Sequence, residues 1–163
     1  HWILSQTKQV GSALIAFVGA ANVDLSEMVD WEDVLEKAPI YSPKMLHFMS
    51  EIFFWDIQKG VLWQRLFIQI LREKLAEKNV VCQRKGDDLY VENRKLSVSI
   101  ATVSPVSALM HTALNIKTEG VPVPAIGLDE LSVEVSVFAQ EVLAQAQAEM
   151  EGIIYACQKV RPC

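Results

Sequence analysis

The chain has 163 residues, of which 51% are hydrophobic and 21% are charged. A chain of this size and composition folds around one large core and buries roughly two-thirds of its unfolded surface. Fifteen basic and twenty acidic side chains give a net charge of −5, which argues against a broad surface for nucleic acids or anionic membranes. We therefore expect a single domain over residues 1–163, with neither nucleic acid nor membrane as a partner.

Cysteine usage and hydropathy indicate the compartment. Cys82, Cys157 and Cys163 are widely spaced and contain no CxxC pair, so neither a disulfide framework nor a zinc site is indicated. The longest apolar run, residues 13–21, is too short to span a bilayer and lacks the flanks of a signal peptide. These features predict a cytoplasmic protein.

Two apolar segments at the N-terminus, HWIL and SALIAFVGAANV, are typical of strands, and Gly19 predicts a bulge or turn in the second. An acidic run follows, which fits either a metal- or amine-binding loop or a solvated turn. Its members are Asp24, Glu27, Asp30, Glu32 and Asp33.

The next segment begins with Ser42-Pro43, a typical helix start, and predicts a helix that ends near Gly60. Four-residue spacing would place His47 and Glu51 on one face of this helix, either as two metal ligands or as a hydrogen-bonded pair. Because no further ligand stands nearby, the hydrogen-bonded pair is favoured over the metal site.

Two later segments have apolar residues at helical spacing, from Val61 to Lys78 and from Ser132 or Ser136 to Lys159. The proline-rich run VPVPAIGL predicts an edge strand or a loop between them. Strands, two helices, a strand meander and a long helix together predict an α+β fold, an antiparallel sheet with helices on one face.

The central segment, residues 84–115, alternates polar and apolar side chains. It predicts two antiparallel strands that turn at Asn93-Arg94, and a third strand after Ser104-Pro105. In this register Leu89, Val91, Leu96, Val98 and Ile100 are buried together under the helices. The opposite face then carries Asp88, Lys95, Ser97 and Ser99, and the third strand adds His111 and Asn115. Such a face has room for a small polar ligand.

The run DDLYVENRKLSVSIA resembles the segment of biotin and lipoate protein ligases in which an Asn-Asp pair opens a strand and a Lys begins the next. Asn115 matches an apolar-Asn-apolar signature of the biotin ligases, and His111 falls near a His of the lipoate ligases. The whole chain, with VDWEDV, KMLHFMSEIFF, WQRL and KLSVSIATVSPVSALMH, resembles more closely an uncharacterised prokaryotic family, domain of unknown function 366. This resemblance implies a biotin/lipoate ligase-like, class II synthetase-like fold without an established activity.

The ligase resemblance also implies residue roles. Lys95 matches the Lys that approaches the carboxylate of the acid and of its adenylate, where a cation stabilises developing negative charge. Asp88 matches an Asp near the phosphates and their metal, and Arg84 a basic residue of the biotin ligases. We therefore predict Lys95 and His111 as catalytic, and Arg84, Asp88, Ser97, Ser99 and Asn115 as ligand-binding. The alternative for Lys95 is a structural ion pair with Glu92.

The sequence also departs from the ligase pattern. Asp87 replaces the Asn of the Asn-Asp pair, and Val98 stands where the ligases usually have Gly. The Gly-rich loop that wraps the adenylate has no counterpart, which argues against ATP and magnesium as cofactors, although they stay open. We expect a monomer or homodimer that binds a small carboxylic acid or acyl donor, as an acyltransferase or a ligase. The alternative is a non-catalytic binding or assembly module that keeps the fold without the nucleotide loop.

Overall fold

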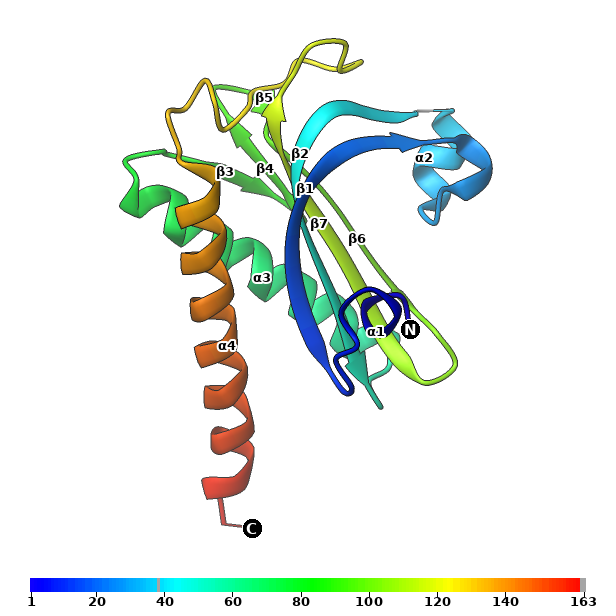
Figure 1. Cartoon of the computed structure of the whole chain (residues 1–163), viewed down its shortest axis with the longest axis vertical. Coiled ribbons are helices and arrows are strands. Elements are labelled where there is room, and N and C mark those ends of the chain that lie inside the picture. Colours follow the sequence, from blue (N-terminus) through cyan, green and yellow to red (C-terminus); the bar gives the residue numbers. More distant parts are fainter. Residues whose placement is uncertain (38, 162–163) are drawn as a thin grey trace.

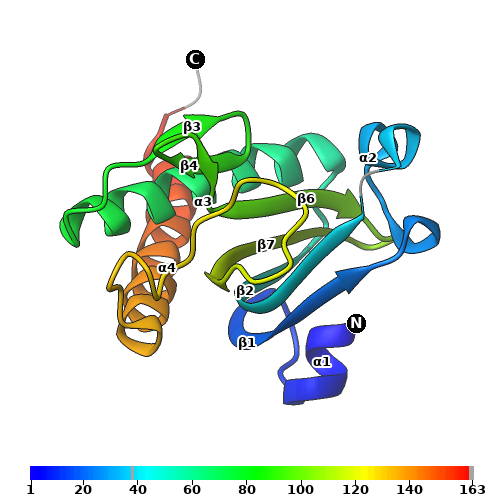
Figure 2. The ribbon, with the colours of Figure 1, turned by 90° about the horizontal axis from the view of Figure 1, so that it is seen from above.

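The computed structural model describes residues 1–37 and 39–161. Its strands form a four-stranded antiparallel sheet in the order β1-β2-β7-β6 and a small sheet in the order β3-β4-β5 (Figures 1 and 2). The elements are α1 (Trp2–Thr7), β1 (Ala13–Val23), a 3-10 turn η1 (Leu25–Glu27), α2 (Trp31–Glu36), β2 (Ile40–Phe53), α3 (Ile57–Glu77), β3 (Gln83–Lys85), β4 (Asp88–Val91), β5 (Arg94–Lys95), β6 (Ser97–Val103), β7 (Ser107–Lys117) and α4 (Val135–Lys159).

The core lies between one face of the large sheet and the two long helices. Leu46 and Phe48 of β2 and Leu114 of β7 point to this side and are almost completely buried. Helix α3 covers them with side chains such as Phe67, and α4 adds Phe138. The predicted α+β fold, with an antiparallel sheet and long helices on one of its faces, is confirmed.

The predicted strand at residues 1–4 is wrong, because this segment begins the short helix α1. The helix ends at Lys8, which has a left-handed backbone with φ of 59° and donates its N–H to the carbonyl of Leu4. Ile3 is the buried residue of this helix, and the ring of Trp2 lies 5.7 Å from that of Phe17 on β1, measured between centroids. Cys163 lies outside the described residues.

The helix predicted after Ser42-Pro43 is also wrong, because this segment is the central strand β2. Both of its faces are largely buried, so no alternation of polar and apolar residues marks it as a strand. The proline is accommodated at a local irregularity. Pairing with β1 skips from Met45 to Ser42, pairing with β7 shifts beside Lys44, and Pro43 pairs with neither neighbour.

The central hairpin turns one residue earlier than predicted. Glu92 and Asn93 form the turn with φ of 50° and 63°, so Lys95 pairs with Tyr90 instead of Glu92. Leu96 then carries the chain from the small sheet to the large one. We call this residue the joint.

The joint reverses which side chains face the helices. Leu89, Val91 and Leu96 are buried in the core as predicted. Val98 and Ile100, in contrast, pair with Ala113 and His111 on the opposite face, so their predicted burial under the helices is wrong. Simple alternation across the hairpin fails because the two strands belong to different sheets.

The other elements agree with the sequence. The helices predicted near Val61–Lys78 and Ser132–Lys159 are α3 and α4. The proline-rich segment is a loop that runs beside β5, as one of the two predictions for it allowed. Lys95 donates its N–H to the carbonyl of Pro124 at 2.8 Å, and Ile126 donates its N–H to the carbonyl of Lys95 at 3.1 Å.

Candidate functional site

The face of the large sheet that α3 and α4 do not cover carries two histidines at hydrogen-bonding distance. We call it the histidine face and define it by Phe17 of β1, Met45, His47 and Met49 of β2, and His111, Ala113 and Asn115 of β7. His47 and His111 come from neighbouring strands, and His47 Nδ1 lies 2.9 Å from His111 Nε2. The ring of Phe17 stacks on His47, with centroids 4.8 Å apart.

The hydrogen-bond partners fix the tautomers of this pair. His47 Nε2 lies 3.2 Å from the carbonyl oxygen of Gly19, which can only accept, so this nitrogen carries the proton. His47 Nδ1 is then an acceptor, and His111 Nε2 donates to it. The lone pair of His111 therefore lies on Nδ1, where it can accept a proton or a hydrogen bond from a ligand.

Burial keeps both rings neutral. It lowers the pKa of His47, against a smaller opposing effect of the hydrogen bond to Gly19. Burial, together with electrostatic repulsion between the protonated forms of the two rings, lowers the pKa of His111 to about 4. At neutral pH the pair is thus an uncharged donor–acceptor chain.

A second cluster contains Lys95 and Asp88. Lys95 Nζ lies 2.8 Å from Asp88 Oδ2, and the two side chains are 30% and 21% exposed. The alternative considered for Lys95, an ion pair with Glu92, is wrong in its partner, because Lys95 pairs with Asp88 and Glu92 pairs with Arg94. The hairpin turns at Glu92-Asn93, one residue earlier than predicted, so Lys95 does not lie opposite Glu92.

Charge and burial compete in this cluster. Burial lowers the pKa of Lys95, but the hydrogen bond and charge of Asp88 outweigh it, and the net pKa is raised. Burial raises the pKa of Asp88, and Lys95 only partly offsets that effect. Burial also raises the pKa of Asp33 on α2, Asp30 adds to it, and Lys95 acts in the opposite direction. Lys95 is therefore a cation at neutral pH with acidic neighbours on two elements.

Asn115 connects Lys95 to the histidine face. Its side-chain Nδ2 donates to the carbonyl of Lys95 at 3.3 Å, and its backbone N–H donates to the carbonyl of Leu96 at 2.9 Å. His111 lies four residues earlier on the same face of β7, which corresponds to roughly 13 Å along an extended strand. Ala113, between them, belongs to a small apolar cluster with Met45 and Ala21.

Three other predicted site residues lie elsewhere. Ser97 is buried on the helix side, where its Oγ accepts from the N–H of Leu89 at 2.9 Å. Ser99 faces the same side and bonds Gln64 of α3. Arg84 is exposed and donates to the carbonyl of Arg65 at 3.3 Å. The reversal at the joint thus separates both serines from Lys95.

His47 and Phe17 were not predicted as parts of this face. Strand periodicity over residues 40–53 is the pattern that identifies His47. Every second residue of a strand lies on one face, which places His47 together with Met45 and Met49.

The side chains considered as metal ligands make hydrogen bonds within the protein. The predicted His47–Glu51 bond is wrong, because Glu51 Oε1 accepts from Ser107 at 2.9 Å and lies 3.2 Å from His1 Nδ1. In the acidic run, Asp30 caps α2 by accepting the N–H of Glu32 at 2.8 Å. Within residues 1–37 and 39–161, no group of three or more His, Cys, Asp or Glu side chains could hold a metal ion. Within the same ranges, no helix is both long and apolar enough to cross a membrane.

The chain matches a known protein family over nearly its whole length. The model of a family described as a domain of unknown function, DUF366, matches residues 1–161. The chain belongs to the DUF366 family. It is 32% identical over 157 residues to the uncharacterized protein MJ0805 of Methanocaldococcus jannaschii, a match that covers 92% of this chain and 71% of that protein.

Solved structures show which folds the DUF366 chain is similar to. A protein of unknown function from Pyrococcus horikoshi is 41% identical, with a TM-score of 0.95 over 100% of this chain and 88% of that one. The putative lipoate protein ligase Ta0514 of T. acidophilum, solved with lipoic acid, gives a TM-score of 0.58 at 12% identity over 91% of this chain and 76% of that one. Biotin protein ligase of Aquifex aeolicus, solved with biotin and ATP, gives 0.52 at 14% identity over 64% and 50%. The DUF366 fold is therefore similar to that of lipoate and biotin protein ligases.

Proposed function

We propose that this DUF366 protein binds a small carboxylic acid, or its activated acyl form, with the carboxyl end at Lys95 and the rest of the molecule along the histidine face. The observation that carries the proposal is the half-buried Lys95–Asp88 pair, which Asn115 holds at the edge of this face. A cation with restricted access to water attracts a carboxylate more strongly than a fully exposed one does.

The stretch between the two clusters suits an acyl chain. Met45 and Val98 border Ala113 with apolar side chains, and polar groups stand at the two ends. A ligand chain of roughly 13 Å would place its far end at His111, whose Nδ1 can accept a hydrogen bond. In this arrangement His111 serves recognition of the far end, and Lys95 is the group nearest the carboxyl carbon.

Transfer of an already activated acyl group fits the site better than ATP-dependent ligation. The chain has no Gly-rich loop to surround an adenylate, whereas an acyl donor needs only a bound carbonyl and an incoming nucleophile. The nucleophile attacks the carbonyl carbon, and Lys95 stabilises the negative charge on the oxygen of the tetrahedral intermediate. The carbonyl then re-forms, the bond to the leaving group breaks, and the leaving group departs with the proton that the nucleophile loses.

Binding can be tested by a thermal-shift screen with lipoate, octanoate and biotin, each with and without ATP and Mg²⁺. Lys95→Met should weaken any hit by about ten- to a hundredfold, because a charge-assisted contact is worth about 1.5–3 kcal/mol. Lys95→Met combined with Asp88→Asn removes both charges and should still weaken binding, but less than Lys95→Met alone, which leaves the Asp88 carboxylate next to the ligand carboxylate. Lys59→Met on the exposed side of α3 should leave the affinity unchanged. Unchanged affinity in the first two variants would refute the site.

Turnover requires a separate measurement on the wild type. Release of AMP, or an acyl-adenylate seen by intact-mass spectrometry, would identify a ligase. Transfer of an octanoyl group from a thioester donor to a carrier protein would identify a transferase. Binding without either reaction would identify a binding module.

A further inference from the structure

The first strand, β1, is an edge of the large sheet, and its pairing with β2 is regular over residues 13–19, before the irregularity between Gly19 and Ala21. Its sequence, ALIAFVGAANV, contains no charged residue and no proline. Along its inner edge it pairs with β2, while no backbone hydrogen bond from residues 13–23 leaves the sheet in the described part of the chain. Long uncharged edge strands are templates for another strand, and proteins normally interrupt them with Lys, Pro or bulges.

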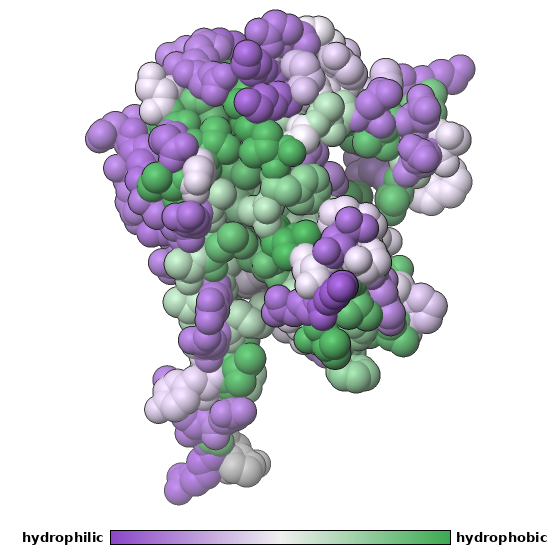
Figure 3. Space-filling view, viewed as in Figure 1, coloured by the Kyte–Doolittle hydropathy of each residue, from purple (hydrophilic) through white to green (hydrophobic). Residues whose placement is uncertain are grey.

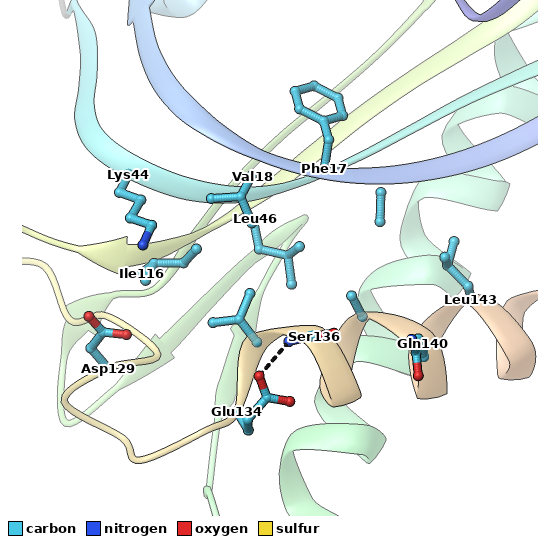
Figure 4. A pocket seen from close by; sticks show the side chains of 13 residues that line it. Phe17, Val18, Lys44, Leu46, Ile116, Asp129, Glu134, Ser136, Gln140 and Leu143 are labelled. Atoms are coloured by element: carbon cyan, nitrogen blue, oxygen red, sulfur yellow. Dashed lines mark hydrogen bonds between the residues drawn. The ribbon is translucent and has the colours of Figure 1, made fainter. Parts of the chain in front are cut away.

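A groove of about 430 Å³ lies beside this edge, between β1 and α4, with a lining that is mostly apolar but also contains Lys44, Asp129 and Glu134. Its lining includes Ala16 and Val18 from β1, Leu46 from β2, and Ala139 and Leu143 from α4. Figure 4 shows Leu46 and Leu143 directed into the groove and Phe17 directed away from it. In the space-filling view, hydrophobic residues gather in the hollow between α4 and the sheet (Figure 3).

We propose that a second copy of this chain covers this edge, with its β1 antiparallel to the first. A strand related to its copy by a two-fold axis pairs with itself antiparallel, so the same uncharged edge serves both partners. The regularly paired part of β1, residues 13–19, ends at the irregularity between Gly19 and Ala21. Its centre, Ala16, therefore lies on the two-fold axis.

With Ala16 on the two-fold axis, each side chain of residues 14–18 has a defined neighbour on the β1 strand of the partner subunit. Paired residues face the same side of a sheet, so Leu14 lies opposite Val18 of the partner subunit, and both point toward the helices. These aliphatic side chains fill the groove beside Leu143. On the other face Phe17 lies opposite Ile15 of the partner subunit. Because Phe17 stacks on His47, each copy covers the outer edge of the other's histidine face.

Light scattering coupled to size-exclusion chromatography tests the pairing. The wild type should have twice the mass of one chain, and Val18→Lys should raise the dissociation constant of the dimer by at least about a hundredfold, because it places a charge in an apolar contact. Leu62→Lys is the control: Leu62 is 63% exposed on α3, whereas Val18 is 49% exposed. Circular dichroism verifies folding. A monomeric wild type, or a dimer that Val18→Lys leaves intact, would overturn the proposal.

Cross-linking tests the register independently of stability. In a background with Cys157→Ser and Cys163→Ser, Ala16→Cys should form a disulfide-linked dimer under mild oxidation, because paired Cα atoms lie about 4.5–5.5 Å apart. Ala20→Cys should not, because its two copies would be roughly 26 Å apart along the strands. Cross-linking through residue 20 in place of residue 16 would overturn the register.

Discussion

At the scale of single residues, the hydrogen-bonded histidines link protonation to folding. The pKa of His111 is lowered to about 4, while an unfolded histidine has its ordinary value of about 6.5. Between these values the unfolded chain binds a proton that the folded chain does not, so the free energy of unfolding should rise with pH in this window and level off above it.

The size of this effect is up to about 3 kcal/mol for the full shift of His111. Urea unfolding at several pH values between 4 and 7.5 would measure it, and His111→Gln should flatten the dependence. An equally steep profile in the variant would show that other groups cause the pH dependence and that folding does not lower the pKa of His111.

The candidate site could be predicted from the sequence only in part. Lys95, Asp88 and Asn115 could be placed together because the resemblance to the ligases identified them by local motif. Ser97 and Ser99 were placed with them by alternation alone, and the joint at Leu96 turns them to the other side. His47 was assigned to a helix, so its contact with His111 could not be anticipated.

At the scale of secondary-structure elements, β6 shows the effect of the joint on stability. Leu96 is fully buried in the core, so Leu96→Ala should cost on the order of 2–5 kcal/mol. Ile100 is half-buried on the opposite face, and Ile100→Ala should cost clearly less, about 1–2 kcal/mol. Chemical denaturation of both variants measures which substitution lowers the free energy of unfolding more. A larger decrease for Ile100→Ala would contradict the assigned faces.

Two glycines provide a second test at this scale. A Cβ on Gly127 would clash with the carbonyl oxygen of Ile116, so the loop before α4 can approach β7 this closely only without a side chain. Gly127→Ala should therefore destabilise the fold by about 1–3 kcal/mol. Gly152 on α4 has open space, and Gly152→Ala should stabilise by about 0.5–1 kcal/mol. Equal effects of the two substitutions in thermal unfolding would contradict this packing.

The helices were predictable because a single buried stripe produces a clear period, as in α3 and α4. Strand β2 was not, because a central strand buried on both faces has no alternation to show. Ser42-Pro43 near its start is typical of the beginning of a helix, so it favoured a helix over a strand. Only the pairing with β1 and β7 shows that Pro43 lies where neither ladder needs its missing N–H.

At the scale of the whole molecule, α4 reaches beyond the sheet that supports it (Figure 1). The buried residues of this helix are Phe138, Val142 and Ala146, all in its first half. In the Val18→Lys variant, amides in residues 150–159 should therefore exchange with solvent faster than those in residues 138–146. Hydrogen-exchange mass spectrometry measures this. Uniform protection along the helix would show that its second half is covered within one chain.

The joint at Leu96 also restricts how the length of the chain can vary between relatives. One residue added or removed between Lys95 and Ser97 would turn every side chain of β6 to the other face, moving Ser99 away from Gln64 and Ile100 into the core. The loop of residues 118–125 has no such restriction at its outer part, because it follows a completed strand. Insertions and deletions among DUF366 proteins should therefore collect in that loop and avoid the joint, so that spacing at the joint is inherited even where residue identity is not.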